Sequence, residues 1–100
     1  MTIDRNKVLA ALRAKREEIE RRYGLRMVGI VGSVARGEAT EGSDIDVIVD
    51  ITGRPTLFSL SQAESDLEQA VGLGLPVEIV LREGMRPRAR RLIERDLVPF

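Results

Sequence analysis

Hydrophobic and polar positions change their spacing several times along the chain, and each change marks an expected element. Apolar residues at helical spacing predict helices over residues 4–23, from about 57 to 71, and from 87 to about 96. Asp4 is a suitable N-cap for the first helix, and Gly24 is a suitable stop. Apolar runs predict strands over residues 25–31, 44–51 and 76–81. We therefore expect one α/β domain over residues 1–100, without repeats or linkers.

A glycine turn and two aspartates stand between the first two predicted strands. The turn is Gly32-Ser33-Val34-Ala35-Arg36-Gly37, and Ser43-Asp44-Ile45-Asp46-Val47 follows it. Side chains alternate across a strand, so Asp44 and Asp46 share one face while Ile45 points into the core. Two carboxylates on one exposed face repel each other, and their oxygens suit Mg²⁺ or Mn²⁺ better than zinc. The pattern predicts a divalent metal site.

The turn itself has the composition of a phosphate-binding loop. Gly32 has no Cβ, so backbone amides there can approach a phosphate closely. Ser33 adds a hydroxyl donor, and amides at the start of a helical turn favour an anion. Arg36, within the turn, is expected to pair with phosphate. Gly32, Ser33 and Arg36 are therefore the predicted nucleotide-binding residues.

Strand directions add a third carboxylate, Glu78. If the turn and the aspartates bind one metal and triphosphate, the first two strands run antiparallel. The second and third are joined through a helix, which predicts a parallel pair and a mixed sheet. Glu78, on the polar face near the start of the third strand, then lies beside Asp44 and Asp46. Asp50 competes for this role, but it lies about 13 Å beyond Asp46 at strand rise, too far to share one metal.

Ten residues, Val34 to Ser43, separate Ser33 from Asp44. The pattern Gly-Ser, ten residues, Asp-x-Asp resembles the signature of the nucleotidyltransferase superfamily that includes DNA polymerase beta. Nearly the whole chain resembles its smallest branch, the minimal nucleotidyltransferases. The resemblance implies the nucleotidyltransferase fold, a small mixed sheet of three to four strands packed with helices. It also implies that the Gly-Ser turn holds the β- and γ-phosphates and that Asp44 and Asp46 bind metal.

At the third acidic position the chain departs from the family pattern. Val77-Glu78-Ile79-Val80 resembles a family motif whose acidic residue is usually an aspartate that helps to activate the attacking hydroxyl. Glu78 is one methylene longer. The expected catalytic and metal-binding residues are therefore Asp44, Asp46 and Glu78, and the competing interpretation is that Glu78 is an ordinary exposed strand residue.

The resemblance also implies a reaction and a partner. AMP would pass from ATP, with Mg²⁺ or Mn²⁺, to a hydroxyl. Small proteins of this branch are similar to antitoxins whose partner is a helical HEPN ribonuclease toxin, and the implied acceptor is a tyrosine of that toxin. The small size of the chain supports this, because it has little room for an acceptor-binding domain of its own. Adenine is implied by the resemblance alone.

Two alternatives of different class stay open. The chain could be a catalytically silent antitoxin that neutralises its partner by binding, or an enzyme acting on a small molecule or an RNA end. Five arginines in the last predicted helix and the segment before it, at positions 86, 88, 90, 91 and 95, favour RNA. Neighbouring acids and the lack of stacking aromatics argue against nucleic acid as a partner.

Composition and charge narrow the chemistry. Hydrophobic residues make up 43% of the chain but aromatics only 3%, which predicts an aliphatic core. Cysteine and histidine are absent, which excludes disulfides, a histidine base and an ordinary zinc site. Residues 1–26 carry eight basic against four acidic side chains, whereas residues 38–68 carry one against eight. An acidic centre suits metal capture. Without a long apolar stretch, we expect a cytoplasmic protein that does not enter a membrane.

The last four residues, Leu97-Val98-Pro99-Phe100, are mostly apolar. Two interpretations stay open for this tail. It could form part of a surface that binds a partner, or Phe100 could fold back and cover the edge of the chain's own sheet.

Overall fold

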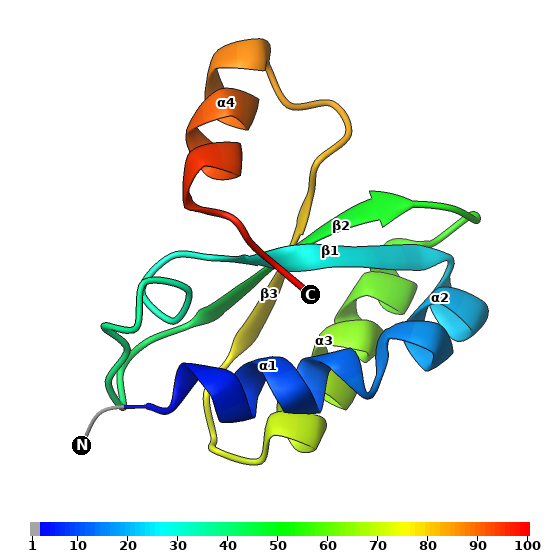
Figure 1. Cartoon of the computed structure of the whole chain (residues 1–100). Coiled ribbons are helices and arrows are strands. Elements are labelled where there is room, and N and C mark those ends of the chain that lie inside the picture. The colour runs from blue at the N-terminus through cyan, green and yellow to red at the C-terminus, as the bar shows by residue number, and fades with distance from the viewer. Residues whose placement is uncertain (1–2) are drawn as a thin grey trace.

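The structure, a computed structural model, describes residues 3–100 and forms one four-stranded sheet with helices on both sides (Figure 1). In chain order the elements are α1 (Arg5–Arg13), α2 (Arg16–Tyr23), β1 (Leu25–Val31), β2 (Ile45–Ile51), α3 (Leu57–Val71), β3 (Val77–Leu81), α4 (Pro87–Asp96) and β4 (Val98–Pro99). The helices α1, α2 and α3 cover one face, and α4 stands on the other side of the sheet (Figure 1). The predicted α/β class is confirmed.

The sheet has the predicted mixed topology. Its strand order is β3-β2-β1-β4, with β1 antiparallel to β2 and β2 parallel to β3. The outer edge of β3 is covered by side chains of α3. The Val77 amide donates to Glu68 Oε1 at 2.9 Å, and the Ile79 amide donates to Glu64 Oε2 at 2.8 Å. These bonds satisfy two edge amides that would otherwise be open to another strand.

The core lies between the sheet and the helices α1, α2 and α3. Leu12 and Ile19 enter it from the helices, and alternate residues of the strands meet them from the sheet. The strand residues of this layer are fully or almost fully buried and aliphatic: Leu25, Met27, Ile30, Ile45, Val47, Val49 and Val77. Within residues 3–100, no helix is both long and apolar enough to cross a lipid bilayer.

The prediction of one helix over residues 4–23 was wrong, although both of its ends were correct. Asp4 caps α1, accepting from the Asn6 amide at 2.9 Å, and Gly24 ends α2 with φ +69°. Between them the chain makes a tight turn, in which the Lys15 amide donates to the Leu12 carbonyl at 3.0 Å. The break allows α1 to pack on α3 while α2 packs on β1 and α3. No proline or glycine lies between Asp4 and Gly24, so the sequence held no local signal for the break.

The apolar tail folds back on its own sheet. Its residues form the short edge strand β4, antiparallel to β1, and the Phe100 amide donates to the Val28 carbonyl at 3.2 Å. Val98 and Phe100 pack against the core. The close approach requires Gly29, because a Cβ there would lie 2.5 Å from the Val98 carbonyl oxygen. Of the two interpretations of the tail, the structure supports the one in which it covers the sheet edge.

Deleting Val98 to Phe100 is therefore expected to destabilise the protein. Two partly buried side chains would leave the core, at a cost of roughly 2 kcal/mol. In a chain of this size that corresponds to a melting temperature lower by about 8 to 16 °C. Calorimetry of the truncated protein beside Pro99→Ala, a change at an exposed position of the same strand, measures it. A truncated chain with the same melting temperature as the parent protein would contradict the packing of Val98 and Phe100 against the core.

Candidate active site

The Gly-Ser turn follows directly from β1 and is fixed at several points. Gly32 has φ +85°, and its carbonyl accepts from the Arg36 amide at 3.1 Å. Val34 and Ala35 are buried, which anchors the middle of the turn. The Arg5 guanidinium donates to the Ala35 carbonyl at 2.8 Å and so ties the first turn of α1 to the loop. The backbone of the predicted phosphate-binding turn is thus held in place by its surroundings.

Asp46 lies directly against this turn. Ile45 and Val47 point into the core, so Asp46 points to the opposite face of β2, where it is half-buried. A Cβ built on Gly32 would be 2.8 Å from Asp46 Oδ2, so any other residue at position 32 would displace the Asp46 carboxylate. Asp44 precedes β2, which begins at Ile45, one residue later than predicted, and its side chain is exposed.

Glu78 is the partner of Asp46 across the parallel pair of β2 and β3. Burial raises the pKa of Asp46, and the negative charges of Glu78 and Asp44 raise it further. A hydrogen-bonding contact with Glu78 acts in the same direction. The structure therefore places Asp44 and Glu78 each within electrostatic reach of Asp46.

The donor chemistry of this group fits a hard divalent cation. All the side chains are carboxylates, the ligands that Mg²⁺ and Mn²⁺ prefer, and a cation would relieve the repulsion that raises the pKa of Asp46. Within the described part of the chain, no three acidic side chains already converge on one metal position. Asp44 and Glu78 are exposed, so their side chains are free to change rotamer.

The predicted phosphate-binding residue Arg36 and the competing acid Asp50 each form an ion pair outside this group. Arg36 is exposed, and its Nε is 3.3 Å from Glu38 Oε2, so it is paired with a neighbour in the loop. Asp50, the competing acid, forms an ion pair with Arg82, whose Nε is 2.9 Å from Asp50 Oδ1. That hydrogen bond holds the pKa of Asp50 below its ordinary value. Asp50 is therefore occupied by a structural ion pair near the other end of β2.

The structure also shows supporting residues that the sequence analysis missed. Glu64 and Glu68 bind the backbone on both sides of Glu78, through the amides of Ile79 and Val77. They fix the strand that carries the third acid. Their spacing of four residues, beside the apolar stripe of α3, places them on one helix face, but sequence spacing does not reveal which backbone that face meets.

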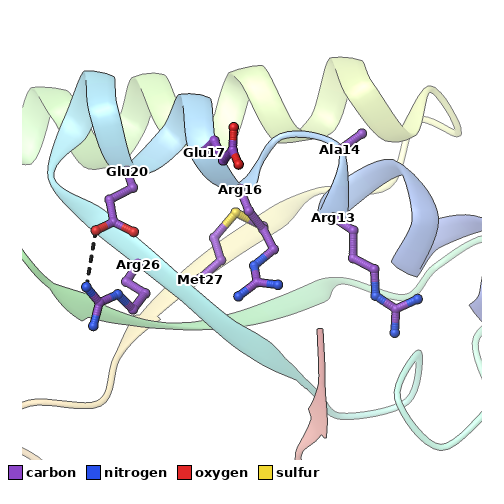
Figure 2. Close-up of a pocket in the computed structure, with 7 residues that line it drawn as sticks. All are labelled: Arg13, Ala14, Arg16, Glu17, Glu20, Arg26 and Met27. Atoms are coloured by element: carbon purple, nitrogen blue, oxygen red, sulfur yellow. Dashed lines mark hydrogen bonds and ion pairs between the residues drawn. The ribbon is translucent and has the colours of Figure 1, made fainter.

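A cavity of about 380 Å³ lies elsewhere, between the break of α1 and α2 and the start of β1 (Figure 2). The guanidinium groups of Arg13, Arg16 and Arg26 point toward the same side of it, and Arg26 pairs with Glu20 at 3.3 Å (Figure 2). Its lining residues are Arg13, Ala14, Arg16, Glu17, Glu20, Arg26 and Met27. None of these is a predicted site residue, so this cavity is separate from the acidic group.

Gly32→Ala is expected to damage the site more than the fold. Alanine at positive φ costs about 1 to 2 kcal/mol, and its Cβ would also displace the Asp46 carboxylate. Gly37→Ala is a matched control, because Gly37 has φ +75° but a Cβ there meets nothing within 4 Å. Both variants should lose similar stability in thermal melts. Only Gly32→Ala should lose most of its enzymatic rate, and equal rates in the two variants would show that the Asp46 contact is unimportant.

Comparison with known proteins agrees with this geometry. A family model for the nucleotidyltransferase domain matches residues 12–98. Protein adenylyltransferase MntA of Thermococcus cleftensis is 36% identical over 87 residues, covering 87% of this chain and 86% of that protein. A solved structure described as a "putative minimal nucleotidyltransferase" is 39% identical, with a TM-score of 0.70, over 92% of this chain and 95% of the other.

A second solved structure, of a toxin-antitoxin with AMP-PNP, has a TM-score of 0.55 over 84% of this chain and 61% of that chain. It is 21% identical, so it shows a shared fold. The family model and the adenylyltransferase relative show that the chain is a nucleotidyltransferase enzyme. The chain belongs to the nucleotidyltransferase domain family and is a minimal nucleotidyltransferase.

Proposed function

We propose that this protein transfers AMP from ATP to a tyrosine hydroxyl of a HEPN-type ribonuclease toxin and thereby acts as its antitoxin. The observation that carries the proposal is the position of Asp46, between Gly32 of the turn and Glu78 of β3. The name of the Thermococcus relative, a protein adenylyltransferase, supports AMP as the group transferred. The toxin-antitoxin structure of similar fold supports a toxin as the partner.

In this proposal the turn binds the triphosphate. Backbone amides near Gly32 and the Ser33 hydroxyl donate to the β- and γ-phosphates. Arg36 and its partner Glu38 are both exposed, so the arginine can turn from that surface ion pair toward a phosphate at little cost. The anchored turn thus orients the α-phosphate toward β2 and β3.

Asp44, Asp46 and Glu78 are the residues that would hold Mg²⁺ or Mn²⁺. When bound, the cation neutralises phosphate charge and favours in-line displacement. The acceptor oxygen attacks the α-phosphorus, the bond from that phosphorus to the oxygen bridging to the β-phosphate breaks, and pyrophosphate leaves. Glu78 takes the proton from the acceptor hydroxyl. Its exposure leaves the carboxylate open to a hydroxyl that another protein brings.

The proposal is tested by the position of the label in ATP. The protein is incubated with Mg²⁺, purified toxin and ATP labelled at either the α- or the γ-phosphate. We expect label on the toxin from α-labelled ATP alone, which distinguishes nucleotidyl from phosphoryl transfer. A toxin variant with phenylalanine in place of the modified tyrosine is the matched control. In a parallel reaction that also contains RNA, label on the RNA and none on the toxin would instead assign the acceptor to an RNA end.

A further inference from the structure

Helix α4 extends away from the sheet on the face opposite α1, α2 and α3 (Figure 1). It has no buried residue, and the side chain of Leu92 is 57% exposed. Its ten residues are fewer than the roughly 12 to 15 that an isolated helix needs for even marginal stability in water. An amphipathic helix of this length gains most of its stability from packing, so contact with another protein surface would stabilise α4.

One side of α4 is turned toward the rest of the protein. Arg90 pairs with Glu94 at 3.0 Å. Ile93 and Leu97 are partly buried and lie on the same side of the helix as Arg90, so this side faces the rest of the protein. The charge of Arg90 also helps, after the stronger hydrogen bond from Arg82, to lower the pKa of Asp50. At about 100° per residue, Leu92 lies roughly 160° around the helix from both Arg90 and Glu94. The exposed leucine is thus on the side turned away from the sheet.

Beside Leu92 runs a stripe of three arginines, Arg88, Arg91 and Arg95, at helical spacing. All three are exposed, and none forms an ion pair with the residues that the structure describes. Asp96 is the acidic residue at the end of this side. We call Arg88, Arg91, Leu92 and Arg95 the Leu92 side of α4. It combines an apolar centre with excess positive charge.

We propose that the Leu92 side of α4 docks onto an acidic surface of the protein that supplies the acceptor hydroxyl. This inference rests on the proposed function. Arginine is enriched in protein interfaces, and opposite charge speeds encounter and selects the partner. The helix leads directly into β4, where Val98 is the partner of Ile30 on β1, two residues before Gly32. Helix α4 stands on the side of the sheet opposite α1, α2 and α3, the side to which Asp46 points (Figure 1). A protein seated on α4 therefore lies on the same side of the sheet as Asp46.

Other occupants fit the Leu92 side less well. A second copy of the chain would bring two arginine stripes together, and like charges at close range repel. An RNA strand would meet Leu92 at the centre of the surface, where no aromatic side chain is available for stacking on bases. A protein with an apolar contact for Leu92 and a rim of aspartates or glutamates satisfies both features.

The test compares two pairs of variants in binding to the purified toxin. Leu92→Ser is matched with Leu73→Ser, since both leucines are similarly exposed, and Arg91→Glu is matched with Arg54→Glu. Calorimetry gives the Kd, and AMP transfer gives KM for the toxin and kcat. We expect Kd and KM to rise at least tenfold in Leu92→Ser and Arg91→Glu, with kcat at saturating toxin unchanged. The controls should bind like the parent protein.

Several results would contradict the proposal that the Leu92 side of α4 is a docking surface. Unchanged Kd in both α4 variants, or no toxin binding by the parent protein, would do so. Loss of affinity for a single-stranded RNA, or of a dimer, in place of toxin affinity would assign the Leu92 side to a different occupant. Toxin binding that depends on α4 without AMP transfer would contradict the proposed function alone. Transfer that is indifferent to α4 would contradict this inference alone.

Discussion

Asp46→Asn is expected to lower the rate of AMP transfer at least about a hundredfold and to leave the fold intact. Asparagine keeps the shape of the side chain at the contact with Gly32 but removes the charge that the proposed metal site needs. Asp44→Asn should lose a similar part of the rate. Initial rates with α-labelled ATP measure both, and Glu17→Gln, at an exposed position on α2, is the control. Full transfer by both aspartate variants would contradict a metal-binding role.

The same substitution should raise stability in the absence of metal. Burial, Glu78 and Asp44 raise the pKa of Asp46 in the fold, so its ionised form opposes folding. The contribution of Asp46 to the stability of the fold is most favourable below the pKa that this carboxyl has in the unfolded chain. It is lost as the pH rises through the higher pKa that the carboxyl has in the folded protein. Near neutral pH, with screening by water allowed for, we expect Asp46→Asn to melt about 2 to 4 °C higher. This difference should shrink as the pH is lowered, and chelator-treated samples measure it.

Glu78→Gln is expected to reduce transfer about a hundredfold or more, because assistance by a general base is worth that much. Glutamine retains the length of the side chain beside Asp46 but cannot accept the proton of the acceptor hydroxyl. A loss below about tenfold would favour the interpretation of Glu78 as an ordinary exposed residue.

The elements that sequence predicted well are those whose signals are local. β1 and α3 have the predicted bounds because apolar spacing and terminal glycines mark them. The break between Ala14 and Arg16 depends on which neighbours α1 and α2 meet, and β4 depends on pairing with a strand nearly seventy positions away in the chain. Such long-range packing leaves no periodic pattern in the sequence.

The acidic group was predictable in outline because strand alternation and one crossover fix where Asp46 and Glu78 lie. Their environment was not. The contact of Asp46 with Gly32 depends on how the turn bends after β1, and the pairing of Arg36 with Glu38 depends on rotamers in a loop. The ion pair of Asp50 with Arg82 joins residues from separate segments, so only the fold shows why Asp50 is occupied.

The intact mass of the toxin most directly tests the central claim. That claim is that the site formed by Asp44, Asp46 and Glu78 beside the Gly-Ser turn transfers AMP. The toxin is incubated with ATP and Mg²⁺ and either the parent protein or the Asp44→Asn, Asp46→Asn double variant. We predict a toxin heavier by whole AMP units with the parent protein and an unmodified toxin with the double variant. Toxin that is neutralised by both proteins while its mass stays unchanged would contradict the account and identify a silent binding antitoxin.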